Sequence, residues 1–260
     1  MIVVAGEALI DLVVSPGATT IRSALGGGPF NTARAAARLG ANAAFLGVLS
    51  RDRFGTALAA ALRADTVDVA MVQLSDMPTT LAIAELDDVG AATYRFYSAE
   101  TASPALEVVP LPAATAILHV GTLGLVLDPM ATAIEGLVRA VDESVIVMID
   151  ANCRPQAIGD RDAYIRRFWR IAERADVIKA SVDDLGYLFG HEQDSGVQRM
   201  IDAGARLVLE TDGGNAARVH GLGTPIEVPV PAVEVVDTIG AGDSFGGAFA
   251  AFWDLSLIHI

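Results

Sequence analysis

The chain has 260 residues, which is enough for one large α/β domain with a small appended element. A hydrophobic content of 52% and a mean hydropathy of +0.45 favour a packed globule over a disordered chain. The formal net charge of −14 argues against nucleic acid and against an anionic membrane surface as partners, because both attract basic proteins.

Targeting signals and covalent cross-links are absent from the sequence pattern. The N-terminal segment reaches Glu7 without the basic region of a secretory signal. The uncharged run 108–127 is interrupted by prolines, glycines and His119, so it does not fit a membrane span. Cys153 is the only cysteine, which excludes an internal disulfide. We therefore expect a cytoplasmic protein.

Short apolar runs alternate with helix-like segments along most of the chain. This alternation predicts βαβ crossovers and a mostly parallel sheet covered by helices on both faces. The expected strands are 2–5, 43–48, 116–120, 145–150, 177–179, 206–210 and 216–220. The expected helices are 29–39, 53–64, 129–141, 161–174, 182–189 and 244–253.

Two stretches break the alternation and predict a small separate β element. Residues 12–25 fit short strands around a Ser-Pro-Gly turn, and residues 79–98 fit a hairpin with its turn at 87–90. So small a β element has too little core to be stable alone. It should therefore lean on the main domain or on a second copy of the chain; a solvent-facing excursion without function is the alternative.

A glycine-rich turn gives the strongest chemical signal. Residues 237–245, Asp-Thr-Ile-Gly-Ala-Gly-Asp-Ser-Phe, follow an extended segment at 225–236 and open a helix-like run. Backbone N–H groups and the helix dipole at such a start favour a phosphate. Asp243 adds a carboxylate there, which fits a base that accepts a proton beside a phosphoryl group. The structural alternative is an ordinary helix cap.

A second glycine-rich motif precedes the first expected helix. Residues 26–33 read Gly-Gly-Gly-Pro-Phe-Asn-Thr-Ala. Three glycines allow the backbone to approach a ligand closely, and Pro29 suits a first helical turn. Asn31 offers both hydrogen-bond donors and acceptors to hydroxyl groups.

The two motifs together resemble the ribokinase-like (PfkB) family of carbohydrate kinases. Asp-Thr-x-Gly-Ala-Gly-Asp-x-Phe is similar to the C-terminal signature of that family, and Gly-Gly-x-x-x-Asn-x-Ala to its N-terminal motif. The resemblance implies a three-layer α/β/α fold with a mostly parallel central sheet, residues 1–254 as the kinase domain, and a small β-sheet lid over the sugar. It also implies that the lid can join two copies as a homodimer. The chain looks most like bacterial fructokinases.

The resemblance also assigns roles to individual residues. Asp243 is implied as the general base, with Gly240, Ala241 and Gly242 as an anion hole. Residues implied to bind the sugar are Asp11, Gly27, Gly28, Asn31 and Phe96. Residues implied to bind the nucleotide are Arg154, Lys179, Thr211, Gly213, Asp237 and Thr238, and Asp184 is implied to contact a metal ion through water.

Several of these positions keep a structural alternative. The segment 150–155 resembles the family's Asp-Pro-Asn-x-Arg, with alanine in place of proline. Ser181 and Asp184 stand where the family has Asn-x-x-Glu, yet Ser181 could equally cap the next helix. Residues 210–214 resemble a nucleotide-phosphate turn and also fit a plain hairpin. Asp11 by itself is more typical of a turn, and we expect His119 to be structural.

The function that follows is an ATP-dependent sugar kinase with Mg²⁺, and K⁺ as an optional second ion, acting first of all on fructose. No Gly-x-x-x-x-Gly-Lys-[Ser/Thr] motif is present, so a P-loop kinase is excluded. No Gly-x-Gly-x-x-Gly follows the first strand, which disfavours a dinucleotide oxidoreductase. The alternatives are a nucleoside kinase or a 2-keto-3-deoxy sugar acid kinase of the same fold, or a truncated non-catalytic sugar-binding relic.

Residues 255–260 stand apart from this pattern. Leu-Ser-Leu-Ile-His-Ile is the translation of CTGTCTCTTATACACATC, a transposase adapter used in sequencing libraries. We expect a non-native tail here and a natural C-terminus that is missing. A genuine stop codon after Ile260 in independently sequenced DNA would contradict this expectation.

Overall fold

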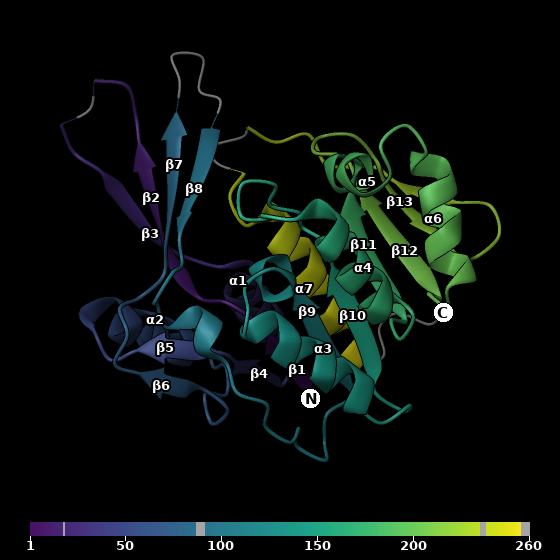
Figure 1. Ribbon diagram of the computed structural model, residues 1–260. Helices are drawn as coiled ribbons and strands as arrows, with labels where there is room; N and C mark the ends of the chain where they lie inside the picture. Colours follow the sequence, from purple (N-terminus) through teal and green to yellow (C-terminus); the bar gives the residue numbers. More distant parts are fainter. Residues whose placement is uncertain (18, 87–91, 235–237, 256–260) are drawn as a thin grey trace.

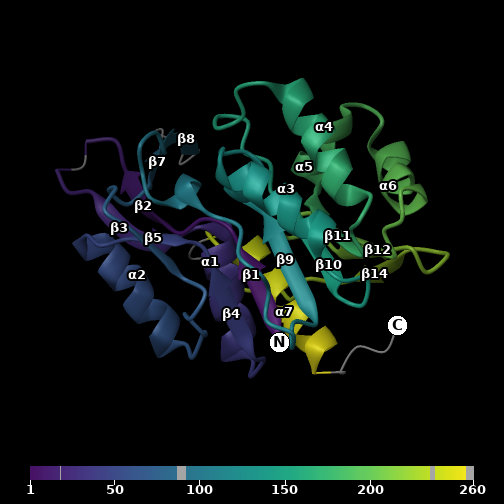
Figure 2. The ribbon, with the colours of Figure 1, turned by 60° about the horizontal axis from the view of Figure 1, so that its bottom comes forward.

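The computed structural model describes residues 1–17, 19–86, 92–234 and 238–255. Helices cover both faces of a central sheet, and a smaller sheet projects from one end of the molecule (Figures 1 and 2). The hairpin turn predicted at 87–90, the predicted nucleotide contact Asp237, and residues 256–260 of the expected tail lie outside the described residues.

The central sheet is mostly parallel, as the alternating pattern predicts. In the described part of the chain it has eight strands in the order β14-β13-β12-β11-β10-β9-β1-β4. Only the pairings β12–β13 and β13–β14 within it are antiparallel. Its strands are β1 (Ile2–Ala5), β4 (Ala43–Leu46), β9 (Ile117–Gly121), β10 (Ile146–Asp150), β11 (Val177–Ser181), β12 (Leu207–Thr211), β13 (Ala217–His220) and β14 (Ile226–Val228).

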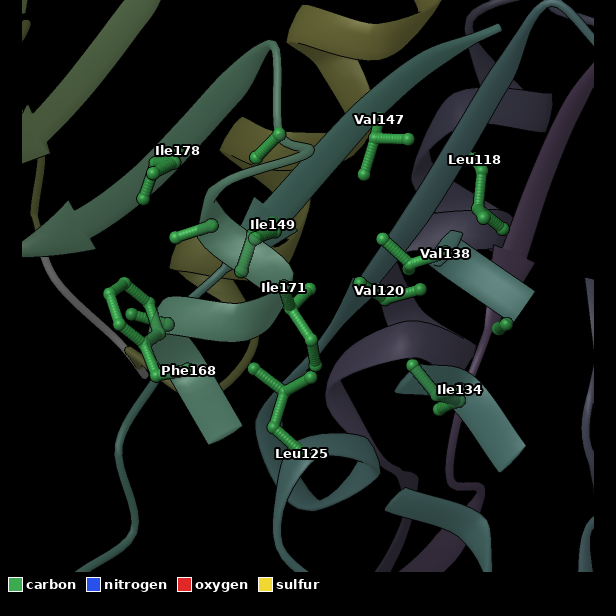
Figure 3. Close-up of a cluster of buried hydrophobic side chains, with 14 of the residues drawn as sticks. Leu118, Val120, Leu125, Ile134, Val138, Val147, Ile149, Phe168, Ile171 and Ile178 are labelled. Atoms are coloured by element: carbon green, nitrogen blue, oxygen red, sulfur yellow. The ribbon is translucent and has the colours of Figure 1, made fainter. Parts of the chain in front are cut away.

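Two hydrophobic layers attach the helices to the sheet. On one face, Val120 and Ile149 of the strands pack against Ile134 and Phe168 of the helices (Figure 3). The helices of this face are α3 (Met130–Ala140), α4 (Arg161–Ala172), α5 (Val182–Phe189) and α6 (Gln193–Asp202). The opposite face is covered by α1 (Gly28–Arg38), α2 (Arg53–Ala64) and α7 (Ala241–Asp254). The fold is therefore the expected three-layer α/β/α arrangement.

The small sheet joins the two stretches that break the alternation. Its order is β3-β2-β7-β8, with β2 and β7 parallel. The first stretch begins earlier than expected, because Leu9 and Ile10 are buried and belong to the same strand as Asp11. We call this sheet the lid; its strands are β2 (Leu9–Val14), β3 (Arg22–Gly26), β7 (Leu81–Leu86) and β8 (Ala92–Tyr97).

The strand expected at 43–48 is divided in two by Gly47. A side chain at this position would lie 2.6 Å from the ring of Phe45, so only glycine fits where β4 ends. The chain continues as β5 (Val48–Ser50), which pairs in parallel with β6 (Gln73–Ser75). Two short 3₁₀ helices complete the described elements: η1 (Ser103–Ala105) and η2 (Thr122–Leu125).

The strand order reverses at β1, which lies between β4 and β9. Connections leave the carboxyl ends of two parallel neighbours toward opposite sides at such a reversal, and the crevice between them is where α/β sheets bind ligands. The residues after β1 and after β9 therefore mark the place to look for a site. Within the described residues, no helix is both long and apolar enough to cross a membrane.

Candidate active site

A buried carboxyl group lies in the first turn of α7. Asp243 is 7% exposed, and the Asn31 side-chain amide donates a hydrogen bond to its Oδ2 at 2.9 Å. The Thr32 hydroxyl donates to the backbone oxygen of Asp243 at 3.3 Å. Burial raises the pKa of Asp243 to about 6. Asp243 is thus ionised at neutral pH with a proton affinity higher than usual, which suits a group that accepts a proton.

The start of α7 has the geometry of an anion site. Gly240 precedes the helix in the left-handed region, with φ +78, and supplies no side-chain cap. The amide of Ala241 donates to the carbonyl of Thr238 at 3.2 Å, so it is committed to the local turn. The amides of Gly242 and Asp243 remain as first-turn donors of the kind that a helix leaves without an internal acceptor.

A cavity of about 190 Å³ opens in front of Asp243, between the lid and the carboxyl ends of β1 and β9. Ten residues proposed from the sequence lie in its wall: Asp11, Gly27, Gly28, Asn31, Phe96, Arg154, Thr238, Gly240, Gly242 and Asp243. Asp11 does so from within β2, not from a turn. The lid contributes Asp11 and Phe96, so the small sheet forms part of the cavity.

Sequence reasoning missed several residues of this wall. Thr122 and Asn152 have φ +52 and φ +33, and the Asn152 amide donates to the Thr122 hydroxyl at 2.9 Å. Strained non-glycine residues in contact at a cavity are typical of functional sites. Each lies two residues after the end of a predicted strand, and Asn152 also belongs to the segment 150–155 that resembles a family motif; these are the signals that could have assigned both to the site. The other missed residues are Glu7, Leu9, Tyr94, Leu123 and Ile239.

Four further predicted residues are not part of this cavity wall and lie on or after the strands β11 and β12 of the same sheet. Lys179 is buried on β11, and its ammonium group contacts both carboxylate oxygens of Asp150 at 2.9 Å. Thr211 ends β12, and Gly213 lies in the antiparallel turn into β13, so the hairpin alternative describes the local structure. Asp184 is considered separately, because its carboxylate is engaged in the fold.

Asp184 forms a reciprocal cap with Ser181 at the start of α5. Its Oδ1 also accepts a hydrogen bond from the Cys153 amide at 2.6 Å. The capping alternative for Ser181 is therefore present, and the water-mediated metal contact of Asp184 stays a prediction. The described residues contain no group of three His, Cys, Asp or Glu side chains placed to hold a metal ion.

His119 is structural, as expected, in the sense that it takes no part in the cavity wall. It lies within β9 and is 1% exposed, and neither ring nitrogen has a hydrogen-bond partner among the described residues. Burial, assisted by the charge of Lys179, lowers the pKa of His119 to about 3. The imidazole is therefore neutral.

A carboxyl group at a helix N-terminus, facing a cavity at the reversal of a parallel sheet, agrees with the class of phosphoryl-transfer proteins that the motifs indicate. The model of the pfkB family carbohydrate kinases matches residues 1–256, and the chain belongs to this family. It is therefore a sugar kinase.

Individual relatives show which members of this family the chain is similar to. The chain is 34% identical to a fructokinase of Rhizobium leguminosarum bv. trifolii over 96% of this chain and 79% of that protein. The fructokinase of Xylella fastidiosa with bound ATP superimposes with a TM-score of 0.89 at 28% identity, over 98% of this chain and 81% of that one. A Vibrio cholerae fructokinase variant with bound fructose, ADP and a potassium ion superimposes with a TM-score of 0.87 at 26% identity, over 97% of this chain and 83% of that one.

Proposed function

We propose that this protein is a fructokinase that transfers the γ-phosphoryl group of ATP to a hydroxyl of fructose, with Asp243 as the general base. The observation that carries the proposal is the position of Asp243, which Asn31 holds against the cavity at the start of α7. The fructokinase relatives support the choice of sugar. Sugar and ATP are thus the small-molecule partners we propose.

Different residues of the cavity wall have different roles in the proposed phosphoryl transfer. Asp243 accepts the proton of the attacking hydroxyl, and the Asn31 amide keeps its carboxylate in the orientation to do so. The amides of the first turn of α7 stabilise the negative charge on the transferred group, with Arg154 supplying positive charge from the opposite wall. Phosphoryl transfer depends mainly on such positioning and electrostatic stabilisation.

The nucleotide is proposed to lie along the carboxyl ends of β10, β11 and β12. Asp150 is aligned with Lys179, and Ser181 with Thr211, so the predicted nucleotide residues share one edge of the sheet. Gly213 and Thr238 lie at the two ends of that edge in our proposal. Lys179 contributes its positive charge from beneath the first turn of α7, since its ammonium group is buried against Gly242.

We propose that metal ions bind mainly to the phosphates of the nucleotide. Mg²⁺ is usually held by substrate phosphates, water and one or two carboxylates, and it neutralises charge on the transferred group when bound. Asp184 fits an indirect contact only, because its oxygens already accept from Cys153 and Ser181. The potassium ion bound to the Vibrio cholerae fructokinase variant supports K⁺ as the second ion of the proposal, and the resemblance to the family is what suggests Thr238 as its neighbour.

The lid is proposed to close over the sugar and to join two copies of the chain. Its strands turn Tyr94 and Phe96 toward the cavity, with their rings stacked at 6.3 Å. On and beside the lid, Tyr97 is 54% and Ile21 60% exposed. Covering these apolar side chains favours a homodimer. Light scattering coupled to size exclusion tests this: a monomer at micromolar concentration would contradict it.

The proposed activity is tested by ADP release from Mg·ATP in the presence of fructose. Asp243→Asn serves as the blank, and Asp202→Asn, which changes an exposed carboxylate at the end of α6, serves as the control. Release above the blank with fructose supports the proposal. Release only with a nucleoside or a 2-keto-3-deoxy sugar acid would assign one of the alternative substrates, and release by Asp243→Asn at the wild-type rate would refute the general base.

A further inference from the structure

Glu7 is a fully buried acidic residue in the connection between β1 and β2. Its two carboxyl oxygens have different partners. Oε1 accepts a hydrogen bond from the amide of Gly28 at 3.0 Å, and Oε2 accepts one from the amide of Gly124 at 3.1 Å. The donors are 21 and 117 residues away in the sequence, so one side chain links three distant segments.

Both donors lie at the start of a helical element. Gly28 is the first residue of α1, whose N-cap residue, Gly27, supplies no side-chain cap. Gly124 belongs to η2, directly after β9. A carboxyl group stabilises such ends by accepting hydrogen bonds from amides that the helix leaves without an internal acceptor. Glu7 therefore fixes α1 and η2 relative to each other from the carboxyl end of β1.

The linked segments carry groups that face the sugar cavity. Asn31, in the first turn of α1, holds Asp243. Gly28 approaches so closely that a Cβ atom there would lie 3.3 Å from Oδ1 of Asp243 and would collide with the hydroxyl of Thr122 in η2. A small shift of α1 against η2 would thus displace Asn31, Thr122 and Asp243 together.

The packing around Glu7 leaves little room for such a shift. Gly27 has φ +109, and a Cβ atom there would be 2.6 Å from the backbone oxygen of Glu7. Gly6 has φ +150, and a Cβ atom there would be 2.5 Å from the ring of Pro29. The arrangement is therefore set by the carboxyl links and by direct backbone contact.

We propose that Glu7 is a positioning residue of the sugar kinase site: by joining α1 to η2 it holds Asn31 and Thr122 at the spacing that the sugar and Asp243 require. This inference rests on the proposed function. Glu7 itself does not take part in proton transfer. Its burial, followed by the smaller effect of the Asp243 charge, raises its pKa to about 8, so Asp243 is the ionised carboxyl of the two at neutral pH.

The test compares Glu7→Gln and Glu7→Asp with the wild type. Glutamine keeps the size but turns an N–H₂ group toward one of the two amides, and aspartate is too short by one methylene to reach both. Misplacement by about 1 Å can cost 10²-fold in rate. We expect the KM for sugar to rise at least about fivefold and kcat to fall at least about tenfold, while the KM for ATP changes less than about twofold. Glu107→Gln, an exposed residue, is the matched control.

A merely structural role gives a different result. Partial unfolding lowers the amount of active enzyme and thus the apparent kcat, but it leaves the KM of the folded fraction unchanged. A sugar KM within about twofold of the wild type in either folded variant overturns the proposal. Two variants are used so that the outcome does not depend on the folding of one.

Hydrogen exchange of the apoprotein supplies a readout that needs no turnover. We expect peptides that cover 27–31 and 121–125 to exchange faster in both Glu7 variants than in the wild type and in Glu107→Gln. Unchanged exchange in these peptides overturns the proposal. A wild-type protein that releases no ADP with any sugar contradicts the proposed function alone, and exchange then decides whether Glu7 holds the two segments together.

Discussion

Two buried carboxyl groups share one cavity wall, yet their surroundings give them different chemistry. Asp243 has the amide of Asn31 as a donor and a pKa of about 6, whereas Glu7 has two backbone donors and a pKa of about 8. The difference follows from burial, since Glu7 is fully buried and Asp243 borders the cavity. Asp243 is thus the carboxyl that is ionised near neutral pH, which is the state that the proposed general base requires.

The pKa of Asp243 predicts the acidic limb of the rate profile. Below pH about 6 the carboxyl gains a proton and can no longer accept one, so kcat/KM for the sugar should fall about tenfold per pH unit. Initial rates between pH 5 and 8 measure this, with enzyme stability checked at each pH. A flat profile down to pH 5 would show that another group takes the proton.

The ion pair of Lys179 and Asp150 predicts a large effect on stability. Both side chains are almost fully buried, at 4% and 2% exposure. Lys179→Met leaves Asp150 without its counter-charge, and we expect the free energy of unfolding in urea to fall by about 3 kcal/mol. Lys179→Met with Asp150→Asn should lose less than the sum of the single variants. The exposed pair Arg51–Asp76 is the control, and Arg51→Met should cost less than about 1 kcal/mol.

At the scale of elements, the contact between α1 and α7 determines where Asp243 lies relative to Asn31. Gly247 makes this contact possible, because a Cβ atom there would be 2.6 Å from the backbone oxygen of Thr32 and 3.1 Å from the amide nitrogen of Ala36. The two helices can approach closely only without that atom. The hydrogen bond between Asn31 and Asp243 depends on this approach.

Gly247→Ala should therefore separate the two helices. We expect the free energy of unfolding to fall by about 1–3 kcal/mol, as for other overpacked positions, and kcat to fall with it. Gly136→Ala is the matched control, because Gly136 lies within α3 and a Cβ atom there would have no other atom within 4 Å. Alanine there should stabilise the protein by about 0.5–1 kcal/mol. Equal melting temperatures for the two variants would refute the packing argument.

The elements that the sequence predicted best are those with local boundary signals. The helices expected at 53–64 and 182–189 coincide with α2 and α5, where Asp52 and Ser181 cap the first turns. In contrast, α6 was not predicted, because Val197 and Met200 are its only fully buried apolar side chains among the described positions and Gly196 interrupts the pattern. Its stability comes from packing against α5 and the sheet strand β12.

Prediction of the site from the sequence is likewise limited to residues with local sequence signals. Asp243 and Asn31 lie in motifs that can be read along the chain, so their proximity could be expected. Glu7 could not be identified this way, since its partners are backbone amides in two distant segments. A backbone partner leaves no trace in residue type other than glycine, and only the folded arrangement reveals it.

For the whole molecule, the shifted pKa values predict how stability depends on pH. A carboxyl whose pKa is raised in the folded state releases its proton more easily when unfolded, so stability falls as the pH rises toward the folded pKa. The pKa of Glu7 is about 8 in the folded state against an ordinary 4.5, so Glu7 lowers stability as the pH rises from about 4.5 to about 8. The pKa of His119 is about 3 in the folded state against an ordinary 6.5, and the pKa of Asp243 is about 6 against 3.8. These two groups change stability at lower pH than Glu7 does, and they change it in opposite directions.

We therefore expect the free energy of unfolding to fall by on the order of 2 kcal/mol between pH 6.5 and 8.5, because each pKa unit corresponds to about 1.4 kcal/mol. Urea titrations at several pH values measure this. Glu7→Gln should show a smaller slope over the same range. A slope in the variant equal to that of the wild type would assign the effect to another group.

The separation of 212 residues between Asn31 and Asp243 also has a consequence for biosynthesis. Helix α7 follows every strand of the central sheet, and until it leaves the ribosome the face of α1 that carries Ala36 has no helix to cover it. Domains fold as units while synthesis proceeds at about 5–20 residues per second. Asn31 and Asp243 can thus meet only after every strand of the central sheet has been synthesised, so the proposed base reaches its hydrogen-bond partner late in biosynthesis.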